Sequence, residues 1–221
     1  MKTIETQRLL LRPWSMNNAE QLFALASDPD VGPRAGWPPH QSVEESREVI
    51  RTVFANDHTW AIVLKETDEL IGCMGYYTHE ESNIGIGEMD AELGYWIGKP
   101  YWGQGLIPEA SRALMRYAFE ELGMRAVWCG YYDGNEKSRK VQTKLGFVYQ
   151  HKTEGLEVRL MNEIRTGHCN LMTKERWQKV ELFRKQKNTL DTFRERNAIT
   201  QAQYDKSLGD LRNLMEMHGV E

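Results

Sequence analysis

The fold of this chain is decided by the stretch Tyr95-Trp96-Ile97-Gly98-Lys99-Pro100-Tyr101-Trp102-Gly103-Gln104-Gly105-Leu106-Ile107-Pro108-Glu109-Ala110. It reads as an apolar strand, a tight glycine loop and the start of a helix. The Gly-x-Gly spacing lets the backbone turn sharply and present bare N–H groups. The first turn of the helix adds unpaired donors and about half a positive charge. The stretch therefore predicts a diphosphate site made of backbone, with the N–H groups of Gly103, Gln104, Gly105, Leu106 and Ile107.

A second motif follows some thirty residues later. It is Asn135-Glu136-Lys137-Ser138-Arg139-Lys140-Val141, closed by Leu145-Gly146-Phe147. Asn135 is a favourable helix N-cap and Gly146 a favourable residue just beyond the helix end. The two motifs, in this order, resemble the GNAT superfamily of acetyl-CoA-dependent N-acetyltransferases. The wider pattern is most similar to the RimJ/RimL type, which acetylates ribosomal proteins.

The resemblance extends over residues 4 to 177. It includes an opening strand at residues 5–12, the strand at 91–97, the Tyr101-Trp102-Gly103 loop, Glu109-Ala110 and the Asn135/Ser138 pair. It implies an α/β fold with a mixed, mostly antiparallel sheet flanked by helices. We therefore expect an acetyltransferase domain over residues 1–177 and a helical extension over residues 178–221.

Composition bounds the class of protein. The net charge of −4 argues against general affinity for nucleic acid and suits an amine substrate. No apolar run approaches the ~20 residues that span a membrane, and no signal segment is expected. Cys73, Cys129 and Cys169 lack any Cys-x-x-Cys spacing, so we expect reduced thiols and a cytoplasmic protein. The six histidines show no His-x-x-x-His pair, and no metal is expected.

Hydrophobic periodicity predicts alternating strands and helices. We expect Asn18 to cap one helix, and Ser42 to open another with a capping box to Glu45. Proline and glycine make residues 28–41 a loop. Strands are predicted at 8–12, 60–64, 70–76, 91–98, 126–132, 147–151 and 168–172, and a long helix at 108–122.

The resemblance also implies how the co-substrate, acetyl-CoA, is held. In the family, the strand before the glycine loop separates from its neighbour and pairs with the pantetheine arm. Here that strand is residues 95–98, with Trp96 and Ile97 at its centre, and one of its N–H groups would polarise the thioester carbonyl. Asn135 would reach the arm and Ser138 would lie close to the thiol. The alternative for Asn135 is a helix cap alone.

Acyl transfer to an amine needs a base, because a free alkyl ammonium has a pKa of about 10. Glu92 is the first candidate, acting directly or through water, because a carboxylate on the central strand would face the cleft. Its rivals are Glu88, Asp90 and Glu163. The alternative for any of them is a solvated charge at a strand edge.

Two positions depart from the family pattern. Pro100 stands at the head of the glycine loop, where many members carry Gln or Arg. Gln142 stands where many relatives have the tyrosine that protonates the leaving thiolate, and an amide cannot supply that proton. Ser138 is then the candidate donor, with Tyr131 and Tyr132 as rivals on the adjacent strand.

The acceptor pocket is expected beside the loop at residues 28–41. Trp37 and Arg34 come from that loop, and Trp14 follows the first strand. We expect these three residues to bind the substrate amine, although Trp37 is equally suited to anchoring its loop in the core.

The segment from Thr173 onward predicts a helix, a tight turn and a second helix. Thr173 would cap the first helix and a Thr200/Gln203 capping box would open the second. This segment resembles the short C-terminal (SHOCT) module appended to unrelated bacterial proteins. The alternative is an amphipathic hairpin that packs on the domain or on a homodimer partner.

Together these observations predict an N-acetyltransferase that moves the acetyl group of acetyl-CoA to a primary amine by direct attack. The amine would belong to a protein N-terminus or to a small molecule, and no nucleic acid or membrane partner is expected. The alternative is a non-catalytic acyl-CoA-binding or interaction module, which Gln142 favours.

Overall fold

The structure is a computed structural model that describes residues 1–82 and 84–217. It divides into two compact units, Met1–Leu171 and Met172–Glu221, and each is described separately below. The sequence places the domain boundary after Trp177 instead, and that boundary stays a prediction. The final residues of the expected extension, 218–221, lie outside the described residues.

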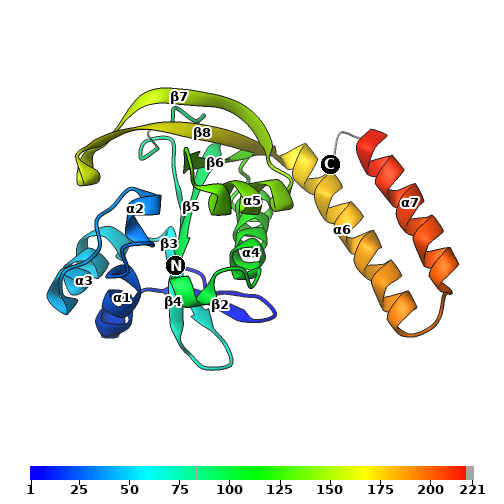
Figure 1. Cartoon of the computed structure of the whole chain (residues 1–221), viewed down its shortest axis with the longest axis horizontal. Helices are drawn as coiled ribbons and strands as arrows, with labels where there is room; N and C mark the ends of the chain where they lie inside the picture. The colour runs from blue at the N-terminus through cyan, green and yellow to red at the C-terminus, as the bar shows by residue number, and fades with distance from the viewer. Residues whose placement is uncertain (83, 218–221) are drawn as a thin grey trace. The chain divides into compact units, whose positions relative to one another are not determined.

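The first unit is built on one mixed eight-stranded sheet in the order β1-β2-β3-β4-β5-β6-β8-β7 (Figure 1). The β1–β5 and the β7–β8 neighbours pair antiparallel, whereas β5 and β6 pair parallel. The strands are β1 (Ile4–Glu5), β2 (Leu9–Pro13), β3 (Thr59–Leu64), β4 (Leu70–Tyr77), β5 (Asp90–Ile97), β6 (Ala126–Tyr132), β7 (Val148–Val158) and β8 (Glu163–Thr173). The predicted α/β architecture with a mostly antiparallel sheet is confirmed.

The parallel pair β5–β6 is short, and the two strands diverge beyond it. Pairing covers only Asp90 with Ala126, Ala91 with Val127 and Glu92 with Trp128. β5 then continues to Ile97, held on its other edge by an unbroken antiparallel register with β4. The two strands therefore separate beyond Glu92, at the C-terminal end of each.

Helices cover both faces of the sheet. One face carries η1 (Met16–Asn18), α1 (Ala19–Ala26), α2 (Gly32–Ala35), α3 (Val43–Val49) and the π-helical turn η2 (Ile50–Phe54) (Figure 1). The other carries α4 (Leu106–Glu120) and α5 (Glu136–Leu145), and η3 (Lys99–Tyr101) leads into the glycine loop. A further short helix, η4 (Arg159–Met161), joins β7 to β8.

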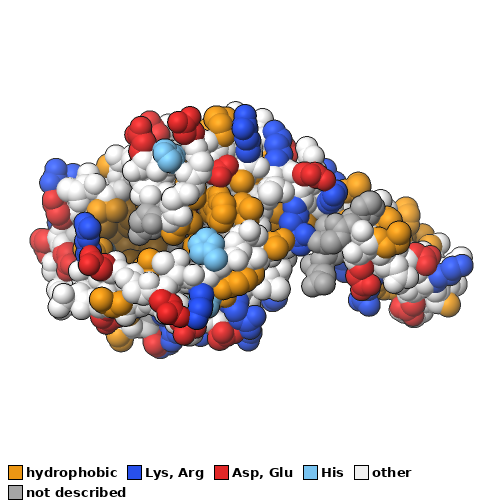
Figure 2. All heavy atoms as spheres, turned by 90° about the horizontal axis from the view of Figure 1, so that it is seen from above, with side chains coloured by type: hydrophobic (Ala, Val, Ile, Leu, Met, Phe, Trp, Pro, Cys, Tyr) orange, Lys and Arg blue, Asp and Glu red, His pale blue; other side chains and the backbone are white. Residues whose placement is uncertain are grey.

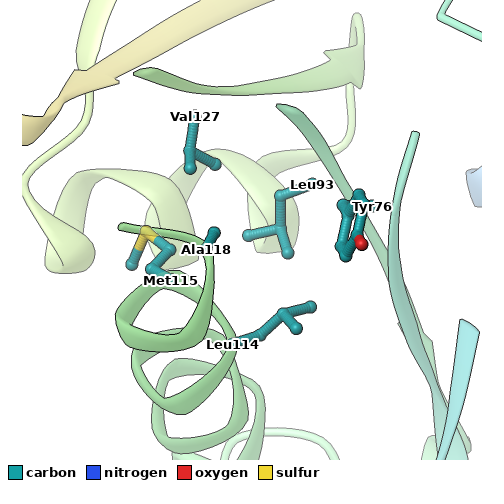
Figure 3. Close-up of a pocket in the computed structure, with 6 residues that line it drawn as sticks. All are labelled: Tyr76, Leu93, Leu114, Met115, Ala118 and Val127. Carbon is teal, nitrogen blue, oxygen red and sulfur yellow. The ribbon is translucent and has the colours of Figure 1, made fainter. Parts of the chain in front are cut away.

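Strand alternation assigns the core to two layers. Ala61, Val63 and Trp96 pack with α1 and α3 on one face. The opposite face packs on α4, where a small cavity of about 10 Å³ remains (Figure 3). Because its volume is that of about one water molecule and its walls are apolar, this cavity is a packing gap and not a ligand site. It is lined by Tyr76, Leu93, Leu114, Met115, Ala118 and Val127.

Several local predictions need correction. Residues 28–41 are not all loop, because Pro33 near the start of α2 and left-handed Gly36 at its end enclose one short helical turn. Asn18 lies at the start of α1 but makes no side-chain cap to it; its Oδ1 accepts from the Ser15 N–H at 3.1 Å instead. The Ser42 cap is present, whereas the Glu45 carboxylate accepts from the Gln41 N–H.

The last two strands are longer than predicted, since β7 and β8 extend through the segment that the sequence leaves ambiguous. The long helix also begins earlier, at Leu106 rather than at Pro108. Cys73, Cys129 and Cys169 are free and buried, as the sequence predicts.

The second unit contains the helices α6 (Lys174–Glu195) and α7 (Gln201–Met217). Thr173 caps α6, and Thr200 and Gln203 form the predicted reciprocal capping box at the start of α7. Phe183 and Leu211 form a buried hydrophobic cluster between the two helices of this hairpin. The predicted helical hairpin is confirmed, and its SHOCT-like character stays a prediction. Within residues 1–82 and 84–217, no helix is both long and apolar enough to cross a bilayer.

Candidate active site

The glycine loop has the backbone that its sequence predicts. Gly103 and Gly105 have φ angles of +78° and +74°, a region that favours glycine. A Cβ at Gly103 would meet no atom within 4 Å, and at Gly105 the nearest atom is Arg8 Nη2 at 3.8 Å. Both positions are open, and α4 starts at Leu106 without a side-chain cap. The loop therefore offers its N–H groups and those of the first helical turn to an anion.

An ion pair between Arg8 and Glu109 stabilises the glycine loop. The Arg8 guanidinium donates to Glu109 Oε2 at 2.7 Å and to the Gln104 carbonyl at 3.1 Å. The Arg8 N–H and the Thr6 hydroxyl donate to Glu109 Oε1 at 2.8 and 2.6 Å. Burial alone would raise the pKa of Glu109, but these donors hold it below its usual value. The sequence placed Arg8 and Glu109 in the family pattern without pairing them.

Cationic side chains gather beside the loop at Trp102. The indole N–H donates to the Ile97 carbonyl at 2.9 Å, which fixes the ring. Lys137 Nζ lies 4.4 Å from the ring centroid and Arg34 Cζ lies 5.9 Å away. Arg34 comes from α2 and Lys137 from α5, so three distant segments meet at this ring.

The separation of β5 from β6 exposes backbone groups of β5. The Gly98 N–H donates to Ile71 of the β4 side at 2.8 Å, whereas the Leu93 carbonyl accepts from the Cys129 thiol of β6. Since bonding directions alternate along a strand, the polar groups of Leu93, Tyr95 and Ile97 point toward the gap. This is the edge that the resemblance assigns to the pantetheine arm.

Ser138 stands in the first turn of α5 within a polar network. Its hydroxyl lies 2.9 Å from the Tyr95 hydroxyl and accepts from Gln142 Nε2 at 3.1 Å. Gln142 is 1% exposed and also donates to the Gly130 carbonyl at 3.1 Å. Its Oε1 accepts from Asn170 Nδ2. Gln142, which stands where many relatives have a tyrosine, is thus a buried amide that positions Ser138.

Asn135 has two roles within the protein itself. Its Oδ1 caps α5 by accepting from the Ser138 N–H at 3.2 Å, and its Nδ2 donates to the Arg34 carbonyl at 3.2 Å. The cap is therefore present, and the amide also ties α2 to the start of α5. Contact of Asn135 with the co-substrate arm stays a prediction.

Glu92 is half-buried on β5 at the last residue paired with β6. Burial raises the pKa of its carboxyl group, and a 2.7 Å hydrogen bond from the Ser82 hydroxyl opposes that rise. By strand alternation Glu92 lies on the face of Trp96, opposite to the face of Tyr95. A half-buried carboxyl group with a raised pKa is suited to accepting a proton.

The rival carboxylates have other surroundings. Asp90 Oδ2 accepts from the Trp128 indole at 3.0 Å and from the Gly87 N–H at 3.3 Å. Glu163 is exposed and paired with Arg165, and Glu88 is exposed. Each therefore has a surface or structural role, and the geometry favours Glu92.

The rival tyrosines are engaged in stacking. Tyr131 stacks on His168 with centroids 4.8 Å apart, and Arg165 lies over Tyr132 at 5.1 Å. Neither contacts Ser138, whereas Tyr95, which the sequence reasoning missed, does. The sequence feature that could have identified Tyr95 is its position, because strand alternation places it on the face of α5 and opposite to Glu92.

The predicted acceptor residues are divided between two places. Trp37 packs edge-on against Trp96 with centroids 5.6 Å apart, and Arg34 reaches Trp102. Trp14 instead stacks on Phe54 at 4.5 Å and packs against the α1–α3 core. Hydrophobic side chains gather in a hollow on the upper surface of the body that holds the sheet (Figure 2). Among the described residues, no group of three or more His, Cys, Asp or Glu is arranged to hold a metal.

Comparison with known proteins identifies the family of this chain. Residues 8–148 match the family described as "Acetyltransferase (GNAT) domain". The "uncharacterized N-acetyltransferase p20" of Bacillus licheniformis is 32% identical over 154 residues, which cover 66% of this chain and 83% of that relative. The ribosomal-protein-serine acetyltransferase of Escherichia coli (strain K12) is 29% identical over 119 residues, covering 52% and 63%.

A solved GNAT-family acetyltransferase from Bacillus anthracis shares the fold. Its TM-score is 0.69 at 20% identity, and the match covers 79% of this chain and 99% of that one. GNAT acetyltransferases use acetyl-CoA as co-substrate, which agrees with the open glycine loop. The chain therefore belongs to the GNAT family of acetyltransferases.

Proposed function

We propose that this protein transfers the acetyl group of acetyl-CoA to a primary amine by direct attack, with residues 1–177 as the catalytic domain. One observation carries the proposal. Glu92 and Ser138 flank the gap between β5 and β6 from opposite faces of the sheet, and the glycine loop follows at the end of β5.

The residues present fit the co-substrate. The N–H groups of Gly103, Gln104, Gly105, Leu106 and Ile107 would hold the diphosphate, because the loop is open and its helix start is uncapped. Along the exposed edge of β5, backbone groups at Ile97 would pair with the pantetheine arm, whereas those of its neighbour Trp96 face β4. Asn135 would reach the arm by exchanging its bond to Arg34.

The chemistry divides between the two faces. Glu92 accepts a proton from the ammonium group, directly or through water, on the face of Trp37 and Trp96. The neutral amine nitrogen then bonds to the thioester carbonyl carbon, and the carbon–sulfur bond breaks. The sulfur leaves on the face of Ser138, whose hydroxyl donates a hydrogen bond to it. The second proton that the attacking nitrogen loses passes to the thiolate, so the products are an N-acetylated amine and a free thiol. No covalent enzyme intermediate is required.

The acceptor is proposed to be a protein N-terminal α-amine or the amine of a small molecule. The relative from E. coli that acetylates a ribosomal-protein serine supports the first. Arg34 and Trp37 of the α2 segment would contact the acceptor; the contacts of Arg34 with Trp102 of the glycine loop and of Trp37 with Trp96 support this proposal. Trp14 stacks on Phe54 in the core, so its contribution to the acceptor pocket would be indirect.

The test is thiol release from acetyl-CoA, measured with peptides that begin with Ser or Ala and with a panel of small primary amines. We expect turnover with at least one acceptor, and a loss of about 10²–10⁴-fold in the Glu92→Gln variant with unchanged acetyl-CoA affinity. Micromolar binding without turnover by any amine would favour the non-catalytic alternative, and an absence of binding would refute the proposal.

A further inference from the structure

The strongest unexplained feature of the site is the contact between Tyr95 and Ser138. Tyr95 comes from β5 and Ser138 from α5, and their hydroxyl oxygens lie 2.9 Å apart. The catalytic scheme above uses Ser138 alone. A serine hydroxyl has one proton to donate and two lone pairs that accept, so its partners decide where the proton points.

The first lone pair is taken by Gln142. Nε2 of Gln142 faces the Gly130 carbonyl, which can only accept, and Oε1 faces the Asn170 amide nitrogen, which can only donate. The Gly130 carbonyl therefore fixes the orientation of the Gln142 amide, and the bond from Asn170 agrees with it. Its Nε2 must donate to Ser138 Oγ at 3.1 Å.

The second lone pair is available to Tyr95. The Tyr95 hydroxyl lies 2.9 Å from Ser138 Oγ but 3.5 Å from the Ser138 carbonyl oxygen, so the hydroxyl is the better acceptor. Either hydroxyl can be the donor of this 2.9 Å hydrogen bond. In the arrangement in which the Tyr95 hydroxyl donates, both lone pairs of Ser138 Oγ are occupied, and the Ser138 proton points into the gap beside β5.

The Tyr95 proton is held across the physiological range. Burial raises the pKa of Tyr95, and burial also raises the pKa of the neighbouring Cys129 thiol. The Glu92 carboxylate raises the Cys129 pKa further from the other face. Tyr95 and Cys129 therefore both remain neutral, and the phenol serves as a donor and not as an acid.

We propose that Tyr95 is a positioning residue for acetyl transfer: by donating to Ser138 Oγ, it directs the Ser138 proton toward the sulfur of bound CoA. The inference rests on the proposed function. It also explains how the site works without a tyrosine at position 142 of α5. Here the phenol comes from Tyr95 of β5, and it acts through Ser138.

The proposal is tested without any acceptor, through the thiol of bound CoA. A donor aimed at the sulfur stabilises the thiolate, so the pKa of the bound thiol falls below that of free CoA. Calorimetry would compare the affinities of CoA and desulfo-CoA, which lacks the sulfur, between pH 6 and 9.5. In the wild type, the advantage of CoA should rise to about tenfold as pH increases through the bound thiol pKa.

Four variants separate the roles. Ser138→Ala should abolish the rise, Tyr95→Phe should reduce it to within about threefold, and the double variant should equal Ser138→Ala, because Tyr95 acts only through Ser138. The matched control is Tyr117→Phe, a half-buried tyrosine on α4 that packs on Trp60, and it should behave as wild type. Desulfo-CoA affinity should be constant throughout.

Four results would overturn the inference. If the CoA advantage of Tyr95→Phe rises with pH as in the wild type, the phenol has no role. If the double variant has a smaller CoA advantage than Ser138→Ala, Tyr95 contacts the sulfur itself. CoA binding with no pH-dependent advantage in the wild type would refute the inference alone, whereas no binding would refute the proposed function too. Should Tyr95→Phe unfold, 3-fluorotyrosine at position 95, a stronger donor, must enlarge the wild-type rise.

Discussion

A substitution in the glycine loop should separate the effect of backbone strain on stability from its effect on acetyl-CoA binding. The change is Gly103→Ala, at a φ of +78° where no atom lies within 4 Å of the added Cβ. The methyl group meets nothing, so its whole effect is the cost of holding a non-glycine residue in the left-handed region. That cost is about 1 kcal/mol. The melting temperature of a chain of this size should fall by about 2–4 °C.

Binding should suffer more than stability. The alanine relieves its strain by rotating the peptide planes whose N–H groups face the anion. Loss of one hydrogen bond to a charged phosphate costs about 1.5–3 kcal/mol, which is roughly a 10–150-fold rise in the acetyl-CoA Kd. Isothermal calorimetry with acetyl-CoA measures the Kd, and urea unfolding measures the free energy of unfolding.

The matched control is Gly123→Ala. Gly123 has a φ of +71°, is exposed, and likewise has no atom within 4 Å of an added Cβ, but it lies beyond the C-terminal end of α4. It should lose the same ~1 kcal/mol of stability and keep the wild-type Kd. If Gly103→Ala binds acetyl-CoA as the wild type does while both variants lose stability, the loop does not hold the diphosphate.

Three further predictions concern the surroundings of the site. Ser82→Ala removes the hydrogen bond that lowers the raised pKa of Glu92, so the acidic limb of the kcat/KM profile should move to higher pH; an unmoved limb would exclude Glu92 as the base. Glu109→Gln should cost about 1–2 kcal/mol at pH 7 by urea unfolding. Because the pKa of Glu109 is lowered in the folded state, this difference is present above pH ~4.3 and should vanish as pH falls through the folded pKa; a pH-independent difference would contradict the role of Arg8. Gln142→Leu leaves buried partners unsatisfied and should cost about 2–4 kcal/mol, whereas a melting temperature equal to wild type would mean that the network adds no stability.

The sequence was sufficient for the features that depend on local chemistry. Gly103 and Gly105 need left-handed angles wherever they occur in such a loop, and Asn135 caps a helix through residues three positions away. These interactions are encoded within a few residues, so composition and spacing predict them. The length of α4 and the two helices of the tail follow from the same kind of signal.

The rest depends on residues that are distant in the chain. Arg8 and Glu109 form their ion pair across about a hundred positions, and Tyr95 reaches Ser138 from another element. No periodicity predicts such pairs, because they arise from the order of strands in the sheet. The residue type and position of Trp14 suggest an acceptor role, but they do not predict that it stacks on Phe54, which is forty positions away.

The unbroken register of β5 against β4 has a consequence for how this enzyme can be altered. Glu92 and Tyr95 are three positions apart, an odd separation, and therefore lie on opposite faces of one strand. A single-residue insertion or deletion between them would bring both onto the same face and invert every side chain beyond it. Loops around the acceptor can lengthen or shorten gradually, whereas this segment admits no intermediate length. In directed evolution of this scaffold, acceptor range should be varied in the α2 segment, with the spacing from Glu92 to Tyr95 left unchanged.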